Sequence, residues 1–243
     1  MFEKLFQKYD RLLFFDTETT GFEPEKVDQI IELAAIAIDK DGKTQEMDEF
    51  IHLFKMNELP PKITELTGIL DLTLASEGIE EYEALKKFVD LMQCGEGDTL
   101  LVAHNAQFDL QFLAYSIYRN REKGKGWMIL LNECDYLDTL TVYKDRRRYP
   151  HKLESAIAEY HLSGKVVNSH RAIDDCLALF EVTKAMQEER DDLEKYINIF
   201  GVNPKYGISG STLKKVIYHN QGFNNSMTAP EQTLPAIIAK ERR

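Results

Sequence analysis

The 243-residue chain contains three cysteines, seven prolines and a single tryptophan. The cysteines, Cys94, Cys134 and Cys176, stand at unrelated spacings that form neither a disulfide framework nor a zinc-ligand pattern. No run approaches the roughly 18 apolar residues that cross a bilayer, and the N-terminus lacks the unbroken apolar core of a secretion signal. We therefore expect a soluble, cytoplasmic protein in a reducing environment.

Positive charge is also scarce, because 41 acidic residues outnumber 30 Lys and Arg and give a formal net charge of −11. This balance argues against a protein that holds duplex nucleic acid through many phosphate contacts. The basic residues are nevertheless grouped, and such groups are either solvated loop faces or the places where a polyanion docks. The groups are Arg119, Arg121, Lys123 and Lys125; Lys144, Arg146, Arg147, Arg148 and Lys152; and, near the C-terminus, Lys205, Lys214, Lys215, Lys240, Arg242 and Arg243.

The hydrophobic pattern is that of an α/β protein. Apolar runs predict strands over residues 12–15, 29–38, 50–54, 99–103 and 127–131, with Asp41-Gly42 as a hairpin turn. Helical spacing predicts helices over residues 2–9, 61–69, 79–92, 106–118, 138–143, 152–160 and 172–187. Three strands followed by strands that alternate with helices indicate a mixed central sheet flanked by helices. Residues 1–190 are expected to form one domain, and residues 191–243 a basic C-terminal extension or small accessory element.

Two acids end the first predicted strand, in the segment Leu12-Leu13-Phe14-Phe15-Asp16-Thr17-Glu18-Thr19-Thr20-Gly21. Residues i and i+2 of a strand share a face, so Asp16 and Glu18 project to the same side. Their carboxylates repel each other unless a positive charge lies between them, and Mg²⁺ takes oxygen ligands of this kind. Taken alone, the pair fits a solvated strand end better than a metal site, because Asp-x-Glu is common in a chain rich in acids.

A third acid follows the short buried strand 99–103, in the segment His104-Asn105-Ala106-Gln107-Phe108-Asp109. Asp109 falls in the first turns of the next helix, where it is positioned to face the strand end that carries Asp16 and Glu18. An Asp at this place also complements the helix dipole, and His104 and Asn105 also suit a role in satisfying loop backbone groups.

The last candidate segment is Ser169-His170-Arg171-Ala172-Ile173-Asp174-Asp175, at a predicted helix start with Asn168 or Ser169 as the N-cap. On a regular helix, residues four apart share a face, so spacing pairs His170 with Asp174. This pairing holds unless His170 lies in the loop before the helix.

The three segments together resemble the three motifs of the DEDDh 3′–5′ exonucleases, the DnaQ-like group, over about residues 10–188. The segments Ile63–Ile69 and Leu137–Leu140 are similar to stretches common between those motifs. The resemblance implies a ribonuclease H-like fold, with the first three strands antiparallel and the later ones parallel. It also implies four metal-binding acids, and its His-x₄-Asp spacing selects Asp175 over Asp174. The implied site consists of Asp16, Glu18, Asp109, Asp175 and the general base His170, which then lies outside the regular helix.

The implied chemistry suits these residue types. Two Mg²⁺ or Mn²⁺ ions, held by four carboxylates, activate the attacking water and stabilise the leaving 3′ oxygen of a phosphodiester. Imidazole changes its protonation state near neutral pH, as a general base requires. By the same resemblance, the pocket for the terminal nucleotide is lined by Thr19, Thr20, His104, Asn105 and Phe108.

The resemblance implies 3′–5′ hydrolysis that releases nucleoside 5′-monophosphates from single-stranded or frayed ends. We expect DNA as the substrate, in a proofreading or repair-like role that involves a polymerase or another replication or repair partner. One alternative is an exoribonuclease that trims short RNA or RNA 3′ ends, since no residue reveals how a 2′-OH is treated. The other is an accessory subunit that docks a partner. In that context residues 232–237 resemble a sliding-clamp peptide that lacks its aromatic end.

Overall fold

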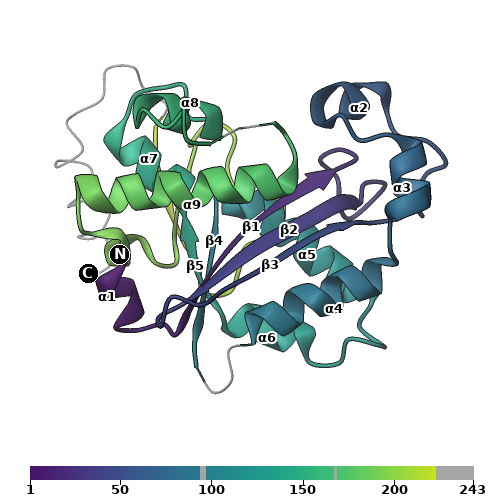
Figure 1. Cartoon of the computed structure of the whole chain (residues 1–243), viewed down its shortest axis with the longest axis horizontal. Coiled ribbons are helices and arrows are strands. Elements are labelled where there is room, and N and C mark those ends of the chain that lie inside the picture. The colour runs from purple at the N-terminus through teal and green to yellow at the C-terminus, as the bar shows by residue number, and fades with distance from the viewer. Residues whose placement is uncertain (94–96, 167–168, 223–243) are drawn as a thin grey trace.

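The computed structural model describes residues 1–93, 97–166 and 169–222. Its main sheet has the strand order β3-β2-β1-β4-β5 (Figure 1). The neighbours β1–β2 and β2–β3 are antiparallel, whereas β1–β4 and β4–β5 are parallel. The expected ribonuclease H-like mixed sheet is thus confirmed. The strands are β1 (Arg11–Thr19), β2 (Ile30–Asp39), β3 (Thr44–Phe50), β4 (Thr99–Ala103) and β5 (Asp135–Asp138).

Helices cover both faces of this sheet, and the alternation of β1 explains how. Leu13 and Phe15 point into the core cluster that includes helices α4 and α5, whereas Leu12 and Phe14 point into the cluster beneath α9. Figure 1 shows α9 lying along one face, with α4, α5 and α6 on the other. The helices are α1 (Glu3–Phe6), α2 (Pro61–Thr67), α3 (Asp71–Glu77), α4 (Glu81–Met92), α5 (Ala106–Arg119), α6 (Trp127–Glu133), α7 (Thr139–Arg146), α8 (Leu153–Glu159) and α9 (Ala172–Glu189).

Two expected strands are wrong. Residues 127–131 belong to helix α6, in which Leu131 is buried while Ile129 is 63% exposed. Trp127 stacks on Tyr82 at a centroid distance of 5.2 Å, which anchors the start of this helix on α4. The third strand occupies Thr44–Phe50 rather than 50–54. The hydrophobic pattern did not reveal it, because it is a polar edge strand that buries only Met47.

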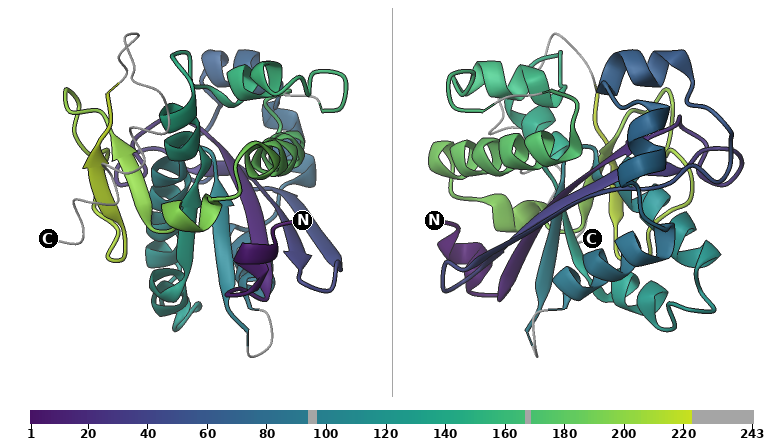
Figure 2. Two further views of the ribbon diagram at one scale, coloured as in Figure 1. Left: turned by 90° about the vertical axis from the view of Figure 1, so that its left-hand side faces the viewer. Right: turned by 45° about the vertical axis from the view of Figure 1, so that its right-hand side comes forward.

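The C-terminal region contains a 3₁₀ helix, Leu193–Tyr196, and a parallel pair of short strands, β6 (Ile199–Val202) and β7 (Ile217–Asn220). Figure 2 shows this yellow-green pair at one side of the molecule. Phe200, Leu213 and Val216 join the core cluster that contains Leu13 and Phe15. The division of the chain at residue 190 stays a prediction. Lys240, Arg242, Arg243 and residues 232–237 lie outside the described residues.

Among the described residues, no helix has both the length and the apolar character that a bilayer crossing requires.

Candidate active site

Asp16, Glu18 and Asp175 meet at the end of β1. The two acids of β1 lie on the face that α9 covers, and Asp175 lies in the first turn of α9. One carboxylate oxygen of each residue lies within 4.8 Å of the others. Asp16 and Glu18 are partly buried and Asp175 is buried. The structure therefore brings together three of the four predicted acids.

Asp109 approaches the same strand from the opposite face. It lies in the first turn of α5 and is 3% exposed. The Thr17 hydroxyl, between Asp16 and Glu18, donates a hydrogen bond of 2.7 Å to Asp109 Oδ1. The proximity of the Asp109 charge is one cause of the raised pKa of Asp16.

Asp174 and Asp175 are neighbours in the chain but have different surroundings in the structure. Helix α9 begins at Ala172, so His170 lies before it, as expected, with a left-handed backbone (φ 56°). Asp175 faces β1, whereas Asp174 Oδ2 accepts a hydrogen bond of 2.5 Å from the Ser169 hydroxyl. Ser169 is not the N-cap, because Arg171 occupies that position without a side-chain cap bond. The other expected N-cap, Asn168, lies outside the described residues.

The acids of this site repel one another and are shielded from solvent, and both effects raise their pKa values. Burial, followed by the charges of Asp109 and Glu32, raises the pKa of Asp16. Burial, followed by the charges of Asp16 and Asp175, raises the pKa of Glu18 to about 9. Burial also raises the pKa of Asp109 to about 7, although the Thr17 hydrogen bond opposes that shift. A hard divalent cation fits this donor set, since it takes carboxylate oxygens and relieves their repulsion.

The threonines predicted to line the substrate pocket are engaged within the loop that follows β1. Thr19 donates to the Gly21 carbonyl at 2.8 Å, and Thr20 donates to Asp28 Oδ1 at 2.9 Å. Both are buried, so their side chains shape the loop.

The other three predicted pocket residues lie after β4. The His104 ring is held between the Thr139 hydroxyl and the His151 carbonyl, each at 2.9 Å. Asn105 is exposed, with a left-handed backbone (φ 72°). Phe108 is partly buried, and its ring lies 6.1 Å from that of Phe22, a side chain that is 83% exposed.

Asp138 is a supporting residue that the sequence reasoning did not select. Its Oδ1 accepts the backbone N–H groups of Asn105 and Ala106 at 2.9 and 3.2 Å. The same side chain caps α7 through Leu140 and Thr141. One buried carboxylate thus holds the starts of α5 and α7, and the Leu137–Leu140 segment was its only signal in the sequence.

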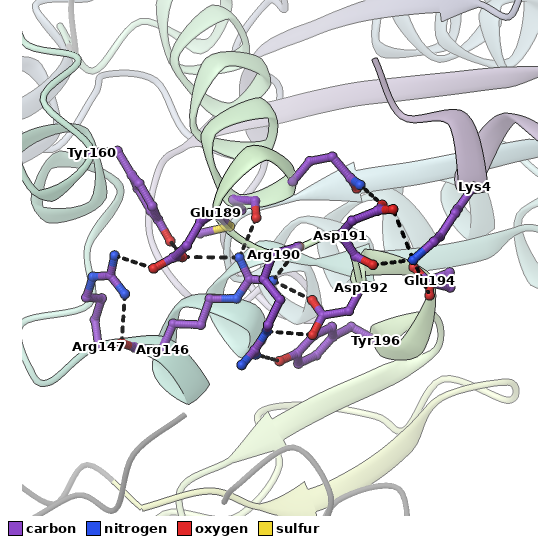
Figure 3. A network of polar contacts seen from close by, with 12 residues as sticks. Lys4, Arg146, Arg147, Tyr160, Glu189, Arg190, Asp191, Asp192, Glu194 and Tyr196 are labelled. Carbon is purple, nitrogen blue, oxygen red and sulfur yellow. Dashed lines mark hydrogen bonds and ion pairs between the residues drawn. The ribbon is translucent and has the colours of Figure 1, made fainter. Parts of the chain in front are cut away.

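Most side chains of the second basic group, within residues 144–152, are buried or form ion pairs within the fold. Lys144 and Arg146 are each 4% exposed. Arg146 Nη2 lies 2.6 Å from Asp192 Oδ1, in the network of Figure 3, and Arg147 pairs with Glu159 and Glu189. In the first group, Arg119 pairs with Glu81 at 2.5 Å. These arginines serve internal ion pairs instead of forming an open cationic face.

A family model described as "Exonuclease" matches residues 13–183, which include all four acids and His170. The chain belongs to the exonuclease family. The DEDDh resemblance is confirmed, and enzymes of this family depend on divalent metal ions.

Relatives and a solved structure agree with this membership. The DNA polymerase III PolC-type of Clostridium perfringens is 32% identical over 214 residues, covering 87% of this chain and 13% of that protein. The 3′-5′ exonuclease DinG of Bacillus subtilis is 33% identical over 130 residues, covering 54% of this chain and 12% of that protein. The chain thus spans about an eighth of the length of these relatives. The nuclease domain of 3′hExo, a DEDDh family member bound to rAMP, has the same fold, with a TM-score of 0.61 and 18% identity over 75% of this chain and 94% of that one.

Proposed function

We propose that this chain is a metal-dependent 3′–5′ exonuclease that hydrolyses DNA from its 3′ end and releases nucleoside 5′-monophosphates. The observation that carries the proposal is the convergence of carboxylate oxygens from Asp16, Glu18 and Asp175 within 4.8 Å at the end of β1. Asp109 lies against the same strand through Thr17. Acids this close and this buried suit divalent cations better than any apolar or neutral ligand.

In this proposal Asp16, Glu18, Asp109 and Asp175 hold two Mg²⁺ or Mn²⁺ ions. Bound metal supplies charge stabilisation to the phosphate and acidity to water. His170 takes a proton from the attacking water on its imidazole. The water oxygen then bonds to phosphorus, the P–O3′ bond breaks, and the 3′ oxygen takes a proton from solvent water while His170 returns its proton to solvent. The place of His170 in the loop directly before α9, five residues ahead of Asp175, supports this role.

The substrate end is proposed to lie beside α5 and the loop after β1. Phe22 and Phe108 offer adjacent aromatic rings next to this site. Base–aromatic stacking favours single strands and frayed ends, whose bases are free to unstack. Thr19, Thr20 and His104 are proposed to form the walls, and Asn105 to contact the nucleotide directly.

DNA is preferred over RNA as the substrate because of the polymerase III name of the clostridial relative. The same name supports a replication or repair partner and a cytoplasmic location. An exoribonuclease is the second candidate, since the 3′hExo domain was solved with rAMP. Residues 191–243 are proposed as an accessory element, and a docking role for them is compatible with catalysis.

Digestion of end-labelled strands tests the proposal. The substrates are single-stranded DNA, mismatched primer–template DNA and RNA of matched sequence, each with Mg²⁺, Mn²⁺ or EDTA. We expect 3′-end shortening of DNA that EDTA abolishes. Asp175→Asn should lower the rate by about a thousandfold or more, because it removes a metal-binding charge. Asp174→Asn, its neighbour, is the matched control and should retain activity. Absence of digestion with Mn²⁺ would refute the enzyme, and faster digestion of RNA would favour the second candidate.

A further inference from the structure

Glu32 is a buried acid beside the site that belongs to none of the motifs. It lies on β2 directly opposite Glu18 and is 0% exposed. Its Oε1 accepts hydrogen bonds from Arg171 Nε at 2.9 Å and Nη2 at 2.7 Å. Its Oε2 accepts the backbone N–H of Ala172 at 3.0 Å. Both oxygens of Glu32 are therefore bound to the start of α9.

These bonds replace the cap that α9 lacks in its own sequence. Arg171, at the N-cap position, makes no side-chain cap bond, and the Arg171 carbonyl accepts the Asp175 N–H at 3.0 Å. The residue that Glu32 holds therefore starts the helical turn that ends at Asp175. His170 is the preceding residue in the chain. The Arg171 guanidinium also lies 4.7 Å above the Phe50 ring, which fixes it against β3.

We propose that Glu32, acting through Arg171 and Ala172, is a positioning residue that sets His170 and Asp175 against Asp16 and Glu18 on β1. The inference rests on the proposed function, because it assigns those residues to catalysis. We assign Glu32 no ligand role, because among the described residues the acids whose oxygens converge are Asp16, Glu18 and Asp175. A glutamine cannot replace it, because its NH₂ group would face either the guanidinium or the Ala172 N–H.

The test compares Glu32→Gln with Asp192→Asn. Asp192 is 3% exposed and pairs with a buried arginine beyond the opposite end of α9, as Figure 3 shows. The helix has 18 residues, so the two sites are separated by roughly 27 Å. Both variants remove the charge of a buried carboxylate bound to arginine, but only Glu32→Gln disturbs the site. Arg171→Lys is a milder second variant, which keeps the charge and loses the planar fork.

We expect Glu32→Gln to lower kcat about 10- to 100-fold, with KM for single-stranded DNA within about twofold of wild type. Calorimetric titration without DNA should give an affinity for Mn²⁺ weakened about 10-fold or more, as is usual when support of a metal ligand is lost. Arg171→Lys should move both quantities in the same direction by less. Asp192→Asn should lower the unfolding temperature without changing kcat or Mn²⁺ affinity.

Equal kcat and Mn²⁺ affinity in Glu32→Gln and wild type would overturn the inference, and so would equal losses in Glu32→Gln and Asp192→Asn. If Glu32→Gln does not fold, unchanged values in Arg171→Lys overturn it. A wild-type protein that binds Mn²⁺ and digests no nucleic acid refutes the proposed function, while the Mn²⁺ affinities still decide whether Glu32 positions Asp175.

Discussion

At the scale of single residues, the site is defined by buried acids whose charges raise the pKa values of their neighbours. Glu18 lies beside Asp16 and Asp175, and its pKa is raised to about 9, first by burial and then by these two neighbours. The folded, metal-free protein therefore keeps a proton that the unfolded chain loses above its ordinary value of about 4.5. A cation at this place has to displace that proton before it gains the carboxylate.

This displacement gives a pH-dependent response to metal. Between about pH 4.5 and about pH 9 the folded state binds more protons at Glu18 than the unfolded state, so this group lowers stability as the pH rises. We expect Mg²⁺ to raise the unfolding temperature more at about pH 8 than at about pH 6, since removing the Glu18 proton costs less free energy at the higher pH. Thermal unfolding with and without Mg²⁺ measures this. Glu18→Gln should flatten the difference, and a smaller Mg²⁺ effect at the higher pH would contradict the prediction.

At the scale of elements, the sequence predicted the segments whose burial is regular. The runs at β1, β2 and β4 are buried throughout their apolar cores, and α5 and α9 start within a few residues of the predicted positions. The short polar strand β5 went unrecognised because four residues, two of them Asp, carry no periodicity. Helix α6 was missed because the stacking of Trp127 on Tyr82 is a tertiary contact.

The site residues that lie within the motifs were predictable, whereas those that depend on partners elsewhere in the chain were not. The motifs carry Asp16, Glu18, Asp109, Asp175 and His170 in the sequence itself. Glu32 was not predicted, because its partners lie 139 and 140 residues away in the chain. For Asp138 the sequence offered only the Leu137–Leu140 segment, since its α5 contacts lie 32 and 33 residues away. Spacing along one helix paired His170 with Asp174. That pairing does not apply, because His170 lies before α9, and Asp175 is the aspartate in the cluster.

Asp138 binds the starts of both α5 and α7, so its replacement should affect both helices. Asp138→Ala leaves the N–H groups of Asn105, Ala106 and Leu140 without their acceptor. We expect a loss of about 2–4 kcal/mol in the free energy of unfolding, as for two helix caps removed together. Asp138→Asn retains one oxygen and should lose about half as much. Urea unfolding measures both, and equal losses would show that the oxygen retained in Asp138→Asn does not satisfy these N–H groups.

At the scale of the whole molecule, residues 199–222 are tied to the part of the chain that carries the site. The Gly201 N–H donates to the Thr141 hydroxyl on α7 at 2.7 Å. Gln107, within the second motif, donates to the Ser209 and Ser211 carbonyls at 2.8 and 2.9 Å. Helix α5 therefore carries Asp109 toward β1 and also supports the C-terminal segment. The boundary at residue 190 rested on composition, charge and weak periodicity, none of which is sensitive to such packing.

Replacement of the buried Phe200 ring tests whether the C-terminal segment stabilises the remainder of the protein. Phe200 is 2% exposed and packs on Tyr136 of β5 and Tyr218 of β7. We expect Phe200→Ala to cost about 3–5 kcal/mol in the free energy of unfolding, the usual range for a large core side chain. Tyr206→Ala, on the same segment but 73% exposed, should change stability by less than about 0.5 kcal/mol. Urea unfolding of both variants and of a chain ending at residue 198 measures how much residues 199–243 stabilise the preceding part of the chain. A truncated chain as stable as the full one would make residues 199–243 a separate accessory element, whereas a destabilised one would make β6 and β7 part of the exonuclease domain.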